Sequence, residues 1–338
     1  MAPLKLANPG WCLALLALAG IILLSLCAGQ YPLPIGEILK SLVRAISGNP
    51  GGGTQASEIM LWSVRIPRVA AALLVGGVLG ATGAAYQGMF RNPLVSPDIL
   101  AVSSGASLGA IWGIFLGWSL GACQVLAFLG GLLSVSVVYT VGRSFSNRDP
   151  VLSLVLAGIA VGALTGALIS LLKVLADPYS QLPTITFWTM GGLSSVTSSD
   201  LALAAPAMIC GLIPLALMRW RINLLCLGDE EALSLGENVN SLRMLLVTSA
   251  TLSCAGAVSL SGTIGWVGLV VPHLSRLLVG PNFVRLLPAS FVLGAGFLTL
   301  TDTLARTLFS IEMPLGVLTS LIGAPFFLFL LARRERDL

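Results

Sequence analysis

The residue types that carry out covalent chemistry are scarce in this chain. It has one histidine, His273, and no paired carboxylates within its apolar segments. The six cysteines are scattered through apolar surroundings without a C-x-x-C pair, so we interpret them as small hydrophobic residues. One histidine also rules out a multi-histidine metal centre within a single chain. The sequence therefore predicts no catalytic site, no metal site and no cofactor.

Nucleotide hydrolysis by the chain itself is also not expected. A phosphate-binding loop of the G-x-x-x-x-G-K-[ST] type needs a lysine after its second glycine. Only Lys5, Lys40 and Lys173 are present, and Leu172 occupies the position where that glycine would precede Lys173.

An acidic segment, residues 227–240, has the pattern of a short helix that binds another protein. Asp229, Glu230 and Glu231 favour the positive end of a helix dipole, and Gly236 can end the helix. Apolar residues give it a second, hydrophobic side. A solvated loop is the alternative. The residues assigned to this segment are Leu227, Gly228, Asp229, Glu230, Glu231, Ala232, Leu233, Leu235 and Gly236.

The composition is that of a membrane protein. The mean hydropathy is +0.95, and only 9% of the residues are charged, against about 25% in ordinary soluble chains. Apolar segments are separated by charged, proline or glycine breaks, and segment 183–192 is too short to cross, so we expect it to lie at the outer face. About ten transmembrane helices are predicted within one domain, residues 1–338, at positions 11–30, 66–90, 99–117, 121–142, 151–175, 199–219, 241–260, 263–279, 286–306 and 314–332.

The first apolar segment also has features of a signal peptide, because Lys5 precedes an apolar run from Trp11 to Ala28. The run is longer than a usual signal core and no Ala-x-Ala site follows it. We expect it to be retained as a membrane span.

Ten crossings place both termini on one side of the membrane. The excess of basic residues assigns that side to the cytoplasm. The basic residues on that side are Lys5, Arg91, Arg143, Arg148, Arg219, Arg221, Arg243, Arg276, Arg285, Arg333, Arg334 and Arg336. Arg44, Arg65, Arg68 and Arg306 fall on the outer side against this bias, and nothing in the sequence indicates that folding requires them.

Charged groups are expected at the ends of the spans. Asp98, for example, belongs to the polar break that follows residue 90. An ion-coupled carrier usually has ionisable groups deep within its spans, so this placement disfavours one.

Small residues recur every four positions in two segments. Gly105, Gly109, Gly113, Gly117 and Gly121 form one series, and Gly158, Gly162 and Gly166 form another. Such stripes let neighbouring helix backbones approach closely. We expect both series to pack inside the bundle, and a glycine-lined pore is the alternative.

Several motifs resemble one known family across nearly the whole chain. They are Arg65-Ile-Pro-Arg68, Gln87-Gly-Met-Phe-Arg-Asn-Pro-Leu94, Ser103-Ser-Gly-Ala-Ser107, the segment Leu227–Gly236, Gly262-Thr-Ile-Gly-Trp-Val-Gly-Leu269, Val271-Pro-His-Leu-Ser-Arg276, Asp302-Thr-Leu-Ala-Arg306, Pro314-Leu-Gly-Val317 and Gly323-Ala-Pro325. On these motifs the chain resembles the membrane permeases of iron-chelate and vitamin B12 ABC importers, the FecCD family.

The resemblance implies an all-α polytopic membrane protein with the type II ABC importer permease architecture. It implies as partners a second permease copy, two cytoplasmic ATP-binding subunits and an extracytoplasmic substrate-binding protein. It further implies a bacterial or archaeal cytoplasmic membrane location, with both termini in the cytoplasm. ATP hydrolysis would then belong to the ATPase subunits, and the chain would be a transport permease and not an enzyme.

The resemblance also suggests roles for particular residues. Arg65, Arg68 and Arg306 correspond to basic pockets that receive glutamates of the binding protein. Segment 227–240 corresponds to the coupling helix on the ATPase. Asn92, Leu94, Pro150, Val151 and Leu152 match cytoplasmic gate segments, although Pro150-Val-Leu152 differs from the small polar residues found there.

The expected substrate is a metal chelate of the iron-siderophore, haem or cobalamin type. An oxyanion such as molybdate or tungstate, carried by the same architecture, is the alternative within the class. Two other classes remain open: an ion-coupled secondary transporter, and a membrane structural or enzyme-anchoring protein.

Overall fold

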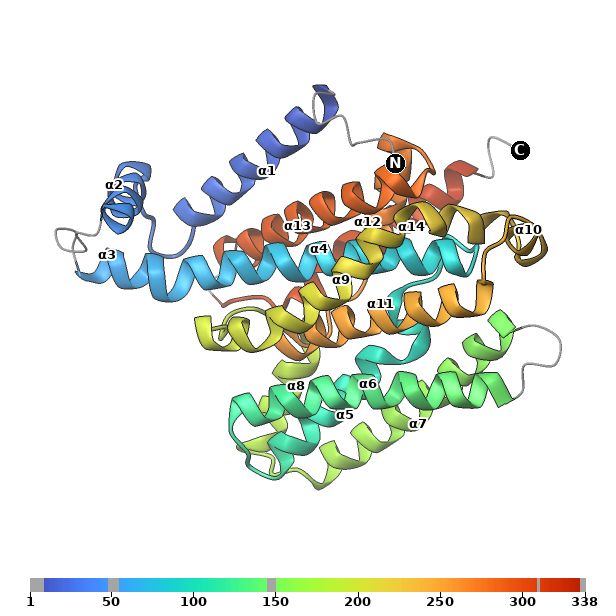
Figure 1. Cartoon of the computed structure of the whole chain (residues 1–338). Coiled ribbons are helices and arrows are strands. Elements are labelled where there is room, and N and C mark those ends of the chain that lie inside the picture. The colour runs from blue at the N-terminus through green and yellow to red at the C-terminus, as the bar shows by residue number, and fades with distance from the viewer. Residues whose placement is uncertain (1–8, 48–54, 145–149, 309–310, 335–338) are drawn as a thin grey trace.

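Helix α4 (Ile66–Met89) runs through the middle of the molecule and packs against α9, α11, α12 and α13 (Figure 1). The computed structural model describes residues 9–47, 55–144, 150–308 and 311–334, which leaves Lys5, Arg148 and Arg336 outside the described residues. The remaining elements are α1 (Pro9–Cys27), α2 (Ile35–Ile46), α3 (Gln55–Ile59), the π-helix η1 (Met60–Arg65), the 3-10 helix η2 (Pro97–Leu100), α5 (Val102–Phe115), α6 (Leu120–Ser144), α7 (Pro150–Leu175), α8 (Gln181–Met190), α9 (Ser198–Leu227), α10 (Asp229–Ser234), α11 (Val239–Ser261), α12 (Val267–Val279), α13 (Phe283–Thr307) and α14 (Leu315–Arg334).

The predicted all-α polytopic fold is confirmed. Within the described residues, seven helical segments are long and apolar enough to cross a membrane: α1, the continuous segment Ala56–Met89, α6, α7, α9, α11 and α13. The shorter apolar helices α5, α12 and α14 coincide with the other three predicted spans. The short helix predicted at 183–192 is α8. Figure 1 shows α2 and α3 at one end of the bundle and α10 at the other. We call these the outer end and the inner end, after the orientation that the sequence predicts.

Helix α12 begins inside the bundle after a non-helical segment. The 13 residues of α12 rise only about 20 Å, less than the ~30 Å of a hydrocarbon layer. Before α12, residues 262–266 form a break in which Gly262 and Trp266 both have positive φ, +64° and +68°. Residues of α8 cover this break, because a Cβ on Gly262 would lie 2.3 Å from the Trp188 carbonyl oxygen. Irregular backbone at this depth is tolerated when protein covers it.

Glycine allows α4 to touch its neighbours through backbone atoms. A Cβ on Gly76 would lie 2.3 Å from the Gly294 carbonyl oxygen of α13, and one on Gly83 would lie 2.0 Å from the Gly268 oxygen of α12. The outer end of α4 is consequently held beside the outer end of α13, where the three predicted docking arginines lie.

The two glycine series differ in their surroundings. In the first, a Cβ on Gly105 or Gly109 would meet α6 backbone oxygens at 2.5 and 2.1 Å, whereas Gly117 and Gly121 have open space around them. In the second, Gly158 packs against the Ile99 carbonyl oxygen. A Cβ on Gly162 would lie 3.7 Å from Ala101 Cβ, an ordinary van der Waals contact, and one on Gly166 would have no atom within 4 Å. The expected close packing of the second series is therefore wrong beyond its first member within this chain.

Elements α2 and η1 were not expected from the sequence. They lie at the outer end of the bundle, where α2 packs against the segment leading into α4. Trp62 donates from Nε1 to Ser41 Oγ at 3.0 Å, and Arg44 pairs with Glu58 at 3.2 Å. The outer position of Arg44 is thus explained by an ion pair within the chain.

Candidate functional site

The three outer arginines come together around one carboxylate at the outer end of α4 and α13. Arg68 binds Asp302 in bidentate fashion, with Nε 2.9 Å from Oδ1 and 3.0 Å from Oδ2 and with Nη2 2.7 Å from Oδ1. Arg306 Nε lies 3.5 Å from Asp302 Oδ2. Asp302 is completely buried, and Arg65, Arg68 and Arg306 are only 3–8% exposed. The cluster is therefore an interior ion-pair network of this chain.

Two of these arginines also bind the end of the first helix. Arg65 donates to the carbonyl oxygens of Leu26, Cys27 and Tyr31, the Cys27 bond being 2.9 Å long. Arg306 donates to Ala28 O at 2.6 Å and to both oxygens of Ser25. The last carbonyl groups of a helix lack partners within it and carry partial negative charge. The expectation that folding does not require the outer arginines is therefore wrong, because Arg65 and Arg306 fix α1 to the bundle.

Arg68 differs from the other two because its second partner is partly open to solvent. It pairs with Glu312, whose side chain is 33% exposed and which lies in the segment between α13 and α14. Three guanidinium groups against the two carboxylates Asp302 and Glu312 leave the cluster with a net positive charge. A partner carboxylate that reaches this site would compete with Glu312 for Arg68.

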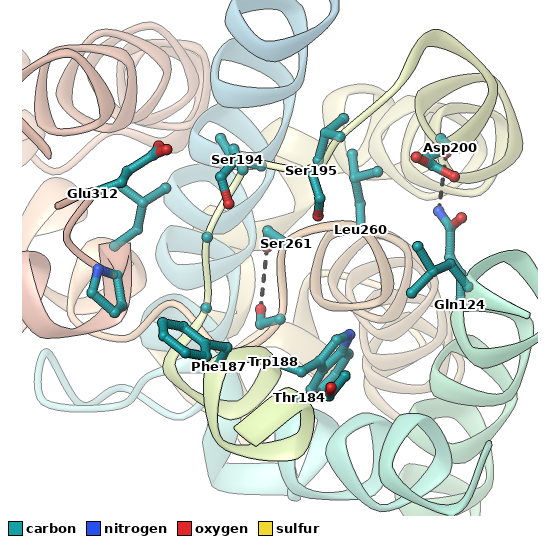
Figure 2. Close-up of a pocket in the computed structure, with 18 of the residues that line it drawn as sticks. Gln124, Thr184, Phe187, Trp188, Ser194, Ser195, Asp200, Leu260, Ser261 and Glu312 are labelled. Carbon is teal, nitrogen blue, oxygen red and sulfur yellow. Dashed lines mark hydrogen bonds between the residues drawn. The ribbon is translucent and has the colours of Figure 1, made fainter. Parts of the chain in front are cut away.

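Beside Glu312 is a cavity of about 560 Å³ at the outer end of the bundle. Figure 2 shows Glu312 on one side of it, Gln124 and Asp200 on the other, and Thr184, Phe187 and Trp188 of α8 along its base. Gln124 Nε2 donates to Asp200 O at 3.0 Å. Hydroxyl groups of Ser194, Ser195 and Ser261 add hydrogen-bonding capacity. The lining thus combines apolar side chains with these hydroxyl groups and with three charged residues, Arg68, Asp200 and Glu312.

Helix α10 is the acidic helix predicted between two spans. Asp229 pairs with Arg243 at 3.0 Å and with Arg91 at 3.6 Å, which attaches the helix to the inner end of the bundle. Its outward surface carries Glu230, Glu231, Leu233 and Leu235, and the two leucines are 59% and 61% exposed. Gly236 follows with a φ of +83°, as its predicted role in ending the helix requires. A solvated loop would not need exposed leucines, so the surface favours docking, which stays a prediction.

The turn after α10 is fixed by a further ion pair. Arg221 Nε lies 3.0 Å from Glu237 Oε2. This hydrogen bond holds the pKa of the Glu237 carboxyl below its usual value. The turn that carries α10 is therefore held to the inner end of α9.

The predicted gate residues lie at the inner end in two segments. Asn92 and Leu94 are exposed, and the Asn92 side chain accepts from the Leu94 backbone N–H at 2.9 Å. Pro150 is the first residue of α7, Val151 is half-buried against the main core, and Leu152 is exposed. Exposed residues at the inner end of the passage are compatible with a gate. The gate itself stays a prediction.

One charged residue occupies a position that the sequence did not indicate. Asp98 belongs to η2, which lies between α4, α5 and α7 and not at the inner surface. The expectation that ionisable groups lie only at the span ends is therefore wrong. The 14 residues of α5 rise only about 21 Å, which the apolar run predicted at 99–117 did not indicate.

Comparison with known proteins identifies the family. Residues 15–333 match the model of the FecCD transport family. The chain belongs to this family. It is a permease subunit of the ABC transporter class and a multi-pass membrane protein.

Relatives and a solved structure agree with this assignment. The chain is 44% identical over 276 residues to a probable iron chelatin transport system permease of Helicobacter pylori, covering 82% of this chain and 83% of that one. It is 39% identical over 326 residues to the molybdate import system permease protein MolB of Haemophilus influenzae, covering 95% and 94%. A putative metal-chelate type ABC transporter solved in an inward-facing conformation superposes with a TM-score of 0.85 at 36% identity, covering 96% of this chain and all of that one.

Proposed function

We propose that this chain is the membrane-spanning permease of a binding-protein-dependent ABC importer, acting as a single domain and paired with a second copy of itself. Family membership over residues 15–333 carries the proposal. Two cytoplasmic ATPase subunits would supply the energy. The proposed location is the cytoplasmic membrane of a bacterium or archaeon with both termini inside, in line with the excess of basic residues at the α10 end.

The two ends of the bundle would bind different partners. The acidic and apolar surface of α10 would enter a groove of the ATPase. Arg65, Arg68 and Arg306 would receive carboxylates of an outer binding protein, with Arg68 the most available because its partner Glu312 is partly exposed. Complementary charges at such a surface set the encounter rate and the orientation of docking.

The proposed substrate is a metal chelate of the iron-siderophore, haem or cobalamin type. The named iron-chelatin relative and the metal-chelate transporter structure support it. The molybdate relative, which covers more of the chain, supports an oxyanion as the second candidate.

Reconstitution tests the proposal. The permease would be co-purified with the ATPase encoded beside it and placed in liposomes, and the neighbouring binding protein would be added outside with the ligand that mass spectrometry identifies on it. We expect uptake only with ATP inside and binding protein outside, and loss of uptake when the ATPase is catalytically inactive. Uptake driven by a proton or sodium gradient without the ATPase would instead show a secondary transporter.

A further inference from the structure

The depth of Asp98 follows from helix positions around it. Asp98 lines a recess together with Leu79 of α4, Cys254 of α11 and Trp266. From Leu79 to the inner end of α4 at residue 89 is about 15 Å, and from the inner end of α11 at residue 239 to Cys254 is about 22 Å. Within a hydrocarbon layer of ~30 Å, these distances place the recess near the middle of the membrane.

Packing fixes this position firmly. A Cβ on Gly268 would lie 2.6 Å from Pro97 Cδ, so η2 lies directly against the start of α12. The Asp98 carboxylate accepts hydrogen bonds from the hydroxyl and the backbone N–H of Ser103, in the first turn of α5. The residue is therefore held in place at this depth and is not a surface group of a loose loop.

Asp98 is nevertheless exposed in the single chain. The recess that it lines has a volume of only about 10 Å³, roughly the space that one water molecule needs. On one side α7 contacts η2 through Gly158, and on the other Gly323 and Phe327 of α14 pack against Trp266. A carboxylate at mid-membrane is costly in lipid, and such residues face a water-filled cavity or the bundle interior. The exposed Asp98 carboxylate is therefore expected on a water-filled side of the bundle.

We propose that Asp98 lines the translocation passage and acts as a charge filter, which favours neutral or cationic solutes and disfavours anions such as molybdate. Asp98 is the charged residue among those that line the recess. In a dimer the carboxylate would occur twice. A passing anion would then be repelled by two negative charges in surroundings of low dielectric constant. The inference rests on the proposed transport function and narrows its substrate by charge, because it disfavours oxyanions and those chelates that carry a net negative charge.

Thiol accessibility measures both the water contact and the charge preference. In a complex with all six cysteines replaced, Ser96→Cys places one thiol on the recess lining, beside Asp98. The complex in lipid discs is treated with a cationic trimethylammonioethyl methanethiosulfonate or an anionic sulfonatoethyl methanethiosulfonate. We expect reaction with both and a faster rate for the cation. Adding Asp98→Asn, which keeps an acceptor for Ser103, should lower the cation-to-anion rate ratio by about tenfold or more.

The controls separate this inference from transport itself. Leu133→Cys, an exposed apolar position in the middle of α6, should stay unreactive as a lipid-facing site. ATPase activity and uptake, measured on each variant, report on folding and on the proposed function independently of thiol modification. An unreactive Ser96→Cys in an active complex, or a rate ratio unchanged by Asp98→Asn, would overturn the filter. So would ATP-driven uptake of an oxyanion recovered from the binding protein.

Discussion

Arg68 and Asp302 join the outer ends of α4 and α13 through a bidentate ion pair whose carboxylate is completely buried. The two residues are 234 positions apart in sequence. Asp302 also faces Arg306 of its own helix at 3.5 Å. One carboxylate therefore faces two buried guanidinium groups, and the end of α1 depends on one of them, Arg306.

Asp302→Asn should destabilise the permease strongly. The amide leaves Arg306 without a counter-charge and Arg68 with only the partly exposed Glu312, and breaking a buried pair from one side costs about 3–5 kcal/mol. Thermal unfolding of the purified permease measures the loss. Glu312→Gln is the matched control, since its side chain is 33% exposed and an exposed pair contributes only about 0–1 kcal/mol. Equal shifts of the melting temperature for both variants would show that Asp302 is not the centre of the network.

Glu312→Gln should also strengthen docking of the binding protein. If Glu312 occupies Arg68 in the absence of the binding protein, removing its charge frees the guanidinium for an incoming carboxylate. Titration of a labelled binding protein onto complexes in lipid discs would show a lower Kd and a faster association, both reduced by salt. An unchanged Kd would indicate that Arg68 serves the fold alone. Replacing Arg65 or Arg306 by glutamate is a weaker test, because either change also removes the hydrogen bonds that hold the end of α1.

Gly109→Leu should prevent correct assembly, whereas Gly162→Leu should be tolerated within the chain. A Cβ on Gly109 would lie 2.1 Å from the Leu126 carbonyl oxygen, which is backbone and cannot rotate away. A Cβ on Gly162 would make only an ordinary van der Waals contact, 3.7 Å from Ala101 Cβ. Overpacking of this kind costs about 1–3 kcal/mol or more. Yield of monodisperse protein and the melting temperature distinguish the two. A folded Gly162→Leu protein that fails to pair with its second copy would place that face of α7 in the subunit interface.

The spans could be predicted because hydropathy and length decide each segment independently of the others.

The two glycine series look identical in sequence, but the neighbouring helix decides whether a glycine is needed. Only the first series packs closely against a neighbouring helix along several turns. Four-residue spacing identifies a stripe and does not identify what covers it. The same limit applies to Arg65 and Arg306, whose partners are carbonyl groups of a helix remote in sequence.

Asp98 was misplaced for a different reason. A polar break after an apolar run normally marks the membrane surface, and the sequence gives no sign that residues 90–101 return into the bundle. The return requires Gly268 and Gly158, which admit Pro97 and Ile99 against α12 and α7. Re-entrant backbone depends on such tertiary covering. The depth of Asp98 within the bundle is therefore determined by the packing of the helices and not by the local sequence.

The coupling role of α10 is best tested through its exposed leucines. Asp229 pairs with Arg243, which is 6% exposed, so Asp229→Ala would confuse loss of docking with damage to the fold. Leu233→Ser with Leu235→Ser changes only outward side chains. Burying two such leucines in a partner contributes about 3 kcal/mol, so their loss should weaken ATPase binding roughly a hundredfold.

Co-purification of the ATPase and the Kd for its reassociation give the readout, and an unchanged melting temperature of the permease shows that the fold is intact. Ser234→Ala, on the same helix, is the control and should retain the ATPase, because only a hydroxyl bonded to Glu231 O is lost. Full ATPase retention and normal uptake after both leucine changes would mean that the exposed apolar surface of α10 is solvated and that coupling passes through another part of the inner end.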